Sequence, residues 1–150
     1  MSIRGSCNCN NIEIVWHTVD RSLVPRECQC HYCLSKNISY VSKSGTRVEV
    51  NIRDERLHHV HQQGTRSAKF HECSNCGELV FVTAEIEDEL YCSLNSNCIS
   101  NPFGFSSAVK MQLHNHTATE RKDRWRQNWC HPVLITSRGN RGSRQAAAPA

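Results

Sequence analysis

The stretch C-S-N-C-G at residues 73–77 places two cysteines three positions apart, directly before a glycine. Two other tight groups precede it, G-S-C-N-C at residues 5–9 and C-Q-C-H-Y-C at residues 28–33. Such spacings let neighbouring thiolates reach one metal ion from a single turn or strand end, as in zinc sites. The glycine after the last cysteine suits a tight turn because it can adopt a positive φ. We therefore predict that the three groups bind zinc.

The cysteines of these three groups number seven, which is an odd count. Four thiolates close a tetrahedral zinc site, whereas three leave one position open, as a catalytic zinc requires. Seven clustered ligands cannot fill two closed sites, so we expect one closed site and one open site. Spacing alone does not settle which pair completes the set begun at residues 73–77, because Cys7 with Cys9 or Cys28 with Cys30 could do so.

The order and separation of the three groups resemble a known family pattern, which runs G-x-C-x-C, then C-x-C-x-x-C, then F-C-x-x-C-G. The chain is similar to the glutathione-dependent formaldehyde-activating enzymes and to the related centromere protein V domain, over about residues 3–130. Within this pattern Asn10 stands where the family usually has glycine, and Gln29 stands where it commonly has histidine. Two residues also separate Phe70 from Cys73. All seven cysteines of the pattern are present.

The resemblance implies a mainly β fold, the β-tent, built of several small antiparallel sheets and stapled by zinc. It also implies two zinc ions per chain with different roles. The structural ion would be held by four cysteines, namely Cys7, Cys9, Cys73 and Cys76. The second ion would lie at the catalytic set of Cys28, Cys30 and Cys33, where one position would remain for a substrate.

The activity implied by the resemblance is that of a carbon–sulfur lyase. Such an enzyme interconverts S-(hydroxymethyl)glutathione with glutathione and formaldehyde, so glutathione or another small thiol is the expected partner. An open zinc position suits this chemistry because a substrate thiol can bind there as thiolate. The centromere protein branch implies an alternative, a non-catalytic zinc-stapled domain that binds protein or nucleic acid. A third possibility is a thiol-handling or metal-handling protein with another substrate.

A fourth protein ligand would close the second zinc site and make both sites structural. The candidates for this ligand are His31, His71, Cys92, Cys98 and Cys130. Of these, we expect Cys92 to be a small buried apolar residue instead. His58 and His59 are expected on opposite faces of one strand, as solvated side chains and not as ligands.

The net charge of +4 is concentrated near the C-terminal end of the sequence. Residues 138–150 carry three arginines and no acid, so subtracting these three charges from +4 leaves +1 for residues 1–137. A nearly neutral body is a poor candidate for binding nucleic acid. We expect one zinc-binding domain over residues 1–137 and a disordered basic tail over residues 138–150.

The ten cysteines also bear on the expected location of the protein. No N-terminal apolar run resembles a signal peptide, and no stretch approaches the roughly 20 apolar residues of a membrane span. Clustered cysteines without such a signal are typical of a reducing compartment, where thiols more often bind metals than form disulfides. We therefore expect a cytoplasmic protein with no membrane partner.

Short segments with period-2 alternation dominate the sequence and predict a mainly β domain. Apolar and polar residues alternate over residues 12–17, and segments 38–41 and 47–50 flank Ser44 and Gly45 as a predicted hairpin. Further strands are predicted over residues 57–61, 79–82 and 109–113, with a helix over residues 120–126 and a turn of helix over residues 32–35.

Overall fold

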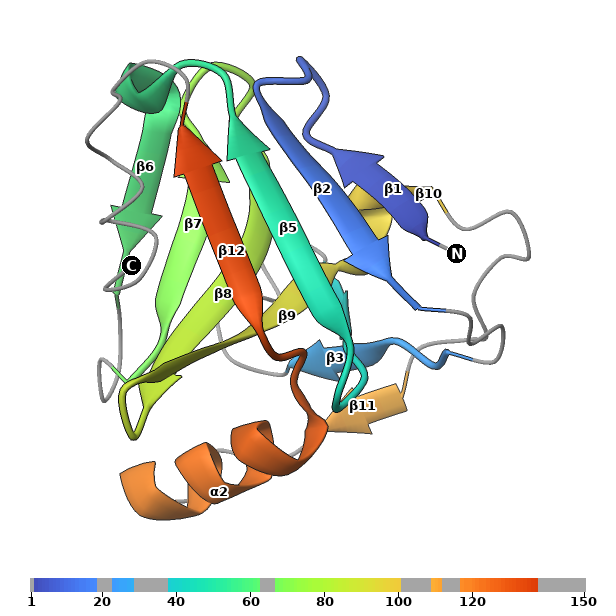
Figure 1. Ribbon diagram of the computed structural model, residues 1–150, viewed down its shortest axis with the longest axis vertical. Coiled ribbons are helices and arrows are strands. Elements are labelled where there is room, and N and C mark those ends of the chain that lie inside the picture. The colour runs from blue at the N-terminus through green and yellow to red at the C-terminus, as the bar shows by residue number, and fades with distance from the viewer. Residues whose placement is uncertain are drawn as a thin grey trace.

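The computed structural model describes six segments of the chain, residues 2–18, 23–28, 38–62, 67–100, 109–111 and 117–137. The described residues are mainly β, as predicted, and form a five-stranded and a seven-stranded sheet. The two sheets face each other, with the single described α-helix across one end of the molecule (Figure 1). The predicted tail and the predicted helical turn at 32–35 lie outside the described residues.

The five-stranded sheet contains both ends of the described chain. Its strand order is β10 (Ile99–Ser100), β1 (Ile3–Ser6), β2 (Ile12–His17), β5 (Arg47–Ile52) and β12 (Val133–Ser137). All neighbours are antiparallel except β12 and β5, which run parallel. Buried and half-buried residues alternate along β2, which confirms the period-2 prediction for that segment.

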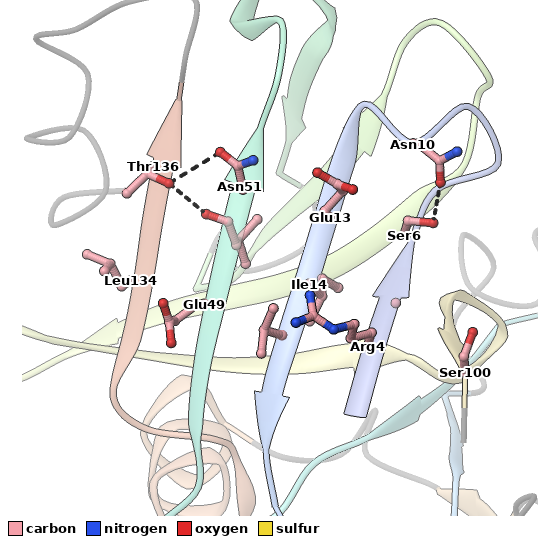
Figure 2. Close-up of a pocket in the computed structure, with 13 residues that line it drawn as sticks. Arg4, Ser6, Asn10, Glu13, Ile14, Glu49, Asn51, Ser100, Leu134 and Thr136 are labelled. Atoms are coloured by element: carbon pink, nitrogen blue, oxygen red, sulfur yellow. Dashed lines mark hydrogen bonds between the residues drawn. The ribbon is translucent and has the colours of Figure 1, made fainter. Parts of the chain in front are cut away.

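The outward face of this sheet carries a polar groove with a volume of about 390 Å³ (Figure 2). Its acidic side chains, Glu13 and Glu49, are paired with basic neighbours on the same face. The Ser6 hydroxyl donates to Asn10 Oδ1 at 2.9 Å and is thereby engaged in the turn beside the groove. The groove contains no cysteine or histidine, so it does not offer the thiol chemistry expected from the sequence.

The seven-stranded sheet contains the two longest described strands, β8 and β9. Its order is β11 (Val109–Met111), β3 (Arg26–Cys28), β4 (Ser39–Val41), β9 (Glu89–Asn95), β8 (Leu79–Ile86), β7 (Lys69–Cys73) and β6 (His58–His61). Only β11 and β3 pair in parallel. Glu87 and Asp88 turn β8 into β9 with φ values of 52° and 67°, the backbone that a two-residue hairpin turn requires. The strands predicted at 57–61, 79–82 and 109–113 thus correspond to β6, β8 and β11 in the described residues.

The predicted hairpin between segments 38–41 and 47–50 is wrong, although both strands and the turn between them exist. Gly45 has φ of 76°, as a glycine in a tight turn can. However, β4 pairs with β3 and β9 in one sheet, whereas β5 pairs with β2 and β12 in the other. The turn therefore carries the chain from one sheet to the other. Local alternation cannot reveal this, because it marks a strand without naming its partner.

The helix α2 spans Ala118–Asn128 and confirms the helix predicted over residues 120–126. It begins with a capping box, in which the Thr117 hydroxyl accepts from the Glu120 amide at 3.1 Å and the Glu120 carboxylate accepts from the Thr117 amide at 2.8 Å. Two short 3-10 helices are also described, η1 (Glu55–Leu57) and η2 (Ser96–Cys98). None of the described helices has the length and apolar character needed to cross a membrane.

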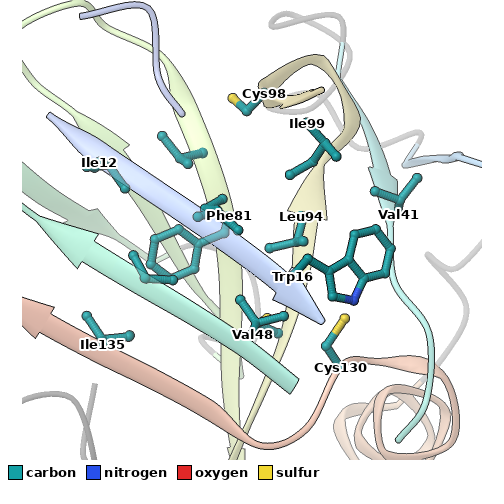
Figure 3. Packing of buried hydrophobic residues seen from close by; sticks show 14 of the residues in the cluster. Ile12, Trp16, Val41, Val48, Phe81, Leu94, Cys98, Ile99, Cys130 and Ile135 are labelled. Carbon is teal, nitrogen blue, oxygen red and sulfur yellow. The ribbon is translucent and has the colours of Figure 1, made fainter. Parts of the chain in front are cut away.

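The hydrophobic core lies between the two sheets (Figure 3). Trp16 from the five-stranded sheet and Phe81 and Leu94 from the seven-stranded sheet are fully buried in it. The Trp16 indole donates to the Thr46 hydroxyl at 2.9 Å, which satisfies the polar atom of this buried ring. Three cysteines outside the sequence groups, Cys92, Cys98 and Cys130, also belong to this core. Cys92 is therefore buried, as predicted.

Candidate metal centre

The first pair of cysteines occupies the turn between β1 and β2. The Cys7 amide donates to the Ile12 carbonyl at 3.0 Å, and the Asn10 amide donates to the Cys7 carbonyl at 3.1 Å. The Ile12 amide also donates to Cys7 Sγ at 3.4 Å. Asn10 has φ of 64°, in the left-handed region that favours glycine and that asparagine tolerates better than most residues. Asparagine in place of the family's glycine is therefore compatible with this turn.

The second pair begins at the end of β7. Cys73 is the last residue of the strand, and the chain turns back through Cys76 toward β8. The Gly77 amide donates to the Cys73 carbonyl at 2.7 Å, and the Cys73 amide donates to the Glu78 carbonyl at 2.9 Å. Gly77 has φ of 75°, which confirms the positive φ predicted for the glycine after the last cysteine.

The two turns meet, so that the four sulfur atoms of Cys7, Cys9, Cys73 and Cys76 all lie within 4.8 Å of one another. Cys9 Sγ is 3.7 Å from Cys7 Sγ and 3.5 Å from Cys73 Sγ. A tetrahedral zinc with bonds of about 2.3 Å to sulfur would hold its ligands roughly 3.8 Å apart. The sulfur separations therefore fit a four-thiolate zinc site. Of the two pairings that spacing left open, the structure brings Cys7 and Cys9 to the pair at 73–76.

One hydrogen bond outside the sulfurs also joins the two turns. Asn8 lies between the first two cysteines, and Glu78 lies two residues after the second pair. The Asn8 amide donates to the Glu78 carboxylate at 2.9 Å. Glu78 also lies against the Cys98 thiol, whose pKa is raised by burial and by this carboxylate. Cys98 is therefore a near neighbour of the centre, but its Sγ donates to the Leu79 carbonyl at 3.7 Å and is not among the four clustered sulfurs.

The four thiols differ in exposure and in acidity. Cys7 and Cys73 are buried, whereas Cys9 is exposed. Burial raises the pKa of Cys7 and raises that of Cys73 to about 12, because a buried thiolate lacks solvation. Hydrogen bonds from the Asn75 side chain and the Asn11 backbone lower the pKa of Cys9 to about 6. Cys9 is thus the thiolate that a cation would meet first, and the buried thiols would release protons on binding.

The second cysteine set lies largely outside the described residues. Cys28 ends β3, where its backbone pairs with Met111 of β11. Cys30 and Cys33 fall in the segment that the structure does not describe, as does His31. The predicted grouping of these three cysteines therefore stays a prediction. Within the described residues, the only cluster of metal-binding side chains is the four-cysteine centre.

The other candidate fourth ligands that the structure describes have partners elsewhere. Both ring nitrogens of His71 are engaged, Nδ1 with His58 Nε2 at 2.9 Å and Nε2 with the Thr83 hydroxyl at 2.7 Å. Cys92 and Cys130 lie directly opposite each other in an isolated antiparallel bridge. His71 could bind a metal only by losing these contacts, and Cys92 and Cys130 are fully buried in the hydrophobic core.

A chain of hydrogen-bonded side chains that ends in the buried His71 lies beside the cysteine centre, on β6 and β7, and was not predicted from the sequence. Glu55 accepts from His58 Nδ1 at 3.1 Å, and His58 in turn meets His71, which stacks on Phe81 with ring centroids 4.2 Å apart. Burial lowers the pKa of His71 well below its usual value. The predicted opposite orientation of His58 and His59 is confirmed, with side-chain exposures of 9% and 59%. The expectation that His58 is solvated is wrong, because its ring lies against Glu55 and His71. The only sequence signal for these histidine contacts was the period-2 alternation over residues 57–61, which places His58 and His59 on opposite faces.

Comparison with known proteins places the chain in no family. No family model matches it, and no curated protein matches it. Among solved structures, it is similar to a Rhodobacter sphaeroides protein determined as a structural genomics target, with 24% sequence identity and a TM-score of 0.49. That match covers 71% of this chain and 99% of the other. A likeness at this level assigns neither a fold family nor an activity.

Proposed function

We propose that the protein binds a structural zinc ion through Cys7, Cys9, Cys73 and Cys76, and that this ion staples a β-tent. The support is geometric, since the four sulfurs converge at separations that suit tetrahedral zinc. Two of the ligands follow β1 of the five-stranded sheet, whereas the other two lie at the end of β7 of the seven-stranded sheet and in the turn after it. An ion at this place would therefore link the two sheets by coordination to its ligands.

The proposed activity is that of a zinc-dependent carbon–sulfur lyase acting on a glutathione or small-thiol adduct such as S-(hydroxymethyl)glutathione. One observation carries it: the four-cysteine centre uses both outer groups, which leaves Cys28, Cys30 and Cys33 as a separate set of three thiolates. Zinc at this set would supply a Lewis acid with one open position, able to hold a substrate thiol as thiolate. The role of the three cysteines is to hold that ion and keep its fourth position free.

The test combines zinc counting with a formaldehyde-release assay on the full chain. The proposal expects two zinc ions per chain and release of formaldehyde from S-(hydroxymethyl)glutathione. Cys30→Ser and Cys33→Ser should each reduce the zinc content to one and abolish turnover, because serine is a poor zinc ligand at neutral pH. Cys98→Ser is the matched control, since it removes a thiol beside the structural centre and outside both sets.

Two outcomes would contradict the proposed activity. One is a Cys30→Ser variant that keeps two zinc ions and full turnover. The other is a parent protein that holds two zinc ions and releases no formaldehyde. The second outcome would favour the non-catalytic zinc-stapled domain, which a pull-down with protein or nucleic acid partners would then examine.

A further inference from the structure

Two buried cysteines that belong to neither zinc set lie directly opposite each other within the core. Cys92 lies in β9, and Cys130 lies between α2 and β12. Each donates its backbone amide to the carbonyl of the other, at 3.0 Å and 2.8 Å, which makes them a hydrogen-bonded antiparallel pair. Both side chains have 0% exposure, and Cys130 points into the core beside Trp16 and Val48 (Figure 3).

The geometry of this pair suits a disulfide, with some strain. Residues in a hydrogen-bonded antiparallel pair have Cα atoms about 5.5 Å apart, which lies within the range of roughly 4.4–6.8 Å found for disulfides. Their Cβ atoms, however, lie about 5 Å apart, against roughly 3.8 Å in a disulfide. Closing the bond must therefore draw the two segments together. A bond formed under such strain is easily reduced, as in regulatory disulfides.

The two thiols influence the acidity of each other. Burial and the hydrogen bond to Cys130 raise the pKa of Cys92. Burial opposes the thiolate at Cys130 as well, but hydrogen bonds from the Cys92 thiol and the Lys43 backbone outweigh it and lower the pKa of Cys130. This difference favours Cys130 as the nucleophile and Cys92 as the resolving thiol.

We propose that Cys92 and Cys130 form an oxidisable dithiol, which a peroxide converts into a reversible disulfide between β9 and the segment that joins α2 to β12. This modification site is independent of the proposed zinc chemistry. The bond would close a loop that contains β10, β11 and α2, so that oxidation would fix the C-terminal part of the domain to the centre of the seven-stranded sheet.

The reaction balances with hydrogen peroxide as the only co-reactant. The Cys130 thiolate attacks one peroxide oxygen, the O–O bond breaks, and the departing hydroxide takes a proton to become water. Cys130 is then a sulfenic acid. The Cys92 sulfur attacks the Cys130 sulfur, and the hydroxyl leaves as a second water with the Cys92 proton. Two thiols lose two electrons in total, and one peroxide gains them. Because both side chains are buried, the peroxide reaches them by local opening around the isolated bridge.

The experiment maps disulfides in the metal-loaded chain of residues 1–150 after treatment with hydrogen peroxide. Free thiols are blocked in denaturant, and the digest is analysed without reduction. We expect a fragment that links Cys92 to Cys130, with a mass loss of two hydrogens, which disappears on treatment with dithiothreitol.

Matched variants and a zinc readout separate this site from the metal centre. Cys92→Ser should remove the link and leave Cys130 as a sulfenic acid that dimedone traps, whereas Cys98→Ser should retain the link. Zinc released during oxidation is measured in parallel with a chromogenic chelator, so attack on the zinc thiolates is scored separately. The mapping of the unsubstituted chain does not depend on whether the variants fold.

Two results would overturn the proposal. The first is that Cys92 and Cys130 both remain alkylatable after peroxide treatment, at concentrations that oxidise other cysteines of the same chain. The second is that Cys130 is found linked to a cysteine other than Cys92.

Discussion

At the residue scale, two backbone conformations determine how the four thiols converge. Asn10 and Gly77 both have positive φ, at 64° and 75°, and each follows a cysteine pair directly. Both turns return the chain toward its own strand, so the sulfurs project toward each other. The glycine was predictable from the sequence, because a glycine after C-x-x-C is a turn signal. The conformation of Asn10 was not, since asparagine occurs in many kinds of turn.

Gly77→Ala should weaken zinc binding, and Gly45→Ala provides its matched control. The two glycines have φ of 75° and 76°, and a Cβ at either would meet nothing within 4 Å, so backbone strain is the shared cost. Each substitution should lower the free energy of unfolding by roughly 1–2 kcal/mol. Only the change at Gly77 should also reduce zinc affinity, by about tenfold, because strain in this turn displaces Cys76. Urea unfolding and chelator competition measure the two quantities; equal zinc affinities for both variants would contradict the prediction.

His71 should make the fold sensitive to acid below about pH 6.5. Burial holds its folded-state pKa well below 6.5, so in acid the unfolded chain binds a proton that the folded chain does not. The stability that neutral His71 contributes is fully present above its unfolded-state pKa. It is lost as the pH falls below that pKa, by at most about 1.4 kcal/mol of unfolding free energy per pH unit.

His71→Phe should retain stacking on Phe81 and should reduce the dependence of the unfolding free energy on pH. Urea unfolding of both proteins between pH 5 and 8 gives the two slopes, and acid loss of metal, common to both, cancels in their difference. Identical slopes would contradict a buried neutral His71.

At the element scale, sequence alternation identified strands more reliably than it identified their partners. The segment at 12–17 was predicted with the same bounds as β2, because one of its faces is buried and the other is half-exposed. The turn at Gly45 was also recognised, yet β4 and β5 belong to different sheets. Strand pairing depends on contacts distant in sequence, so a good turn between two good strands did not make a hairpin. The cysteine groups gave better long-range information, because ligands of one ion must meet.

The capping box of α2 should contribute measurably to stability. Thr117 supplies the cap, whereas Thr119 lies two residues later in the first turn, is exposed, and takes no part in the capping box. Thr117→Ala should lower the free energy of unfolding by about 1 kcal/mol, because the Glu120 amide loses its acceptor. Thr119→Ala makes the same substitution without that loss and should be neutral or slightly stabilising. Thermal and urea unfolding compare the two; equal effects would mean that the box adds nothing.

At the scale of the whole molecule, the cysteine centre lies where the two sheets come together. Cys7 and Cys9 connect β1 to β2, and Cys73 and Cys76 connect β7 to β8, so the centre joins strands of both sheets. The sequence predicted a mainly β domain and this set of four through the family resemblance, although spacing alone left the pairing open. The resemblance implied several small sheets, whereas the described residues form two facing sheets. Local sequence patterns could not predict this, because the number of sheets depends on which strands pair across long sequence separations.

Removal of the metal should therefore loosen the contact between the sheets and not only one turn. Structural zinc in small modules contributes roughly 10–16 kcal/mol of apparent binding energy. A domain with its own hydrophobic core should depend on zinc less completely, so we expect the metal-free protein to remain folded but to melt at least about 10 °C lower. Calorimetry before and after complete chelation, with zinc counted in each sample, measures this change.

Cys76→Ser is the control for that measurement, because it removes one half-exposed ligand without emptying the buried core. Its melting temperature should already be low and should change little on chelation of the structural ion, whereas re-addition of zinc should restore only the unsubstituted chain.

Hydrogen exchange tests whether both sheets depend on the ion. Removal of the metal breaks the link between β1 and β7, so amide protection should fall in both strands together. Protection that falls in the turn at 73–77 alone, with an unchanged melting temperature, would show that the centre braces a loop and does not staple the two sheets.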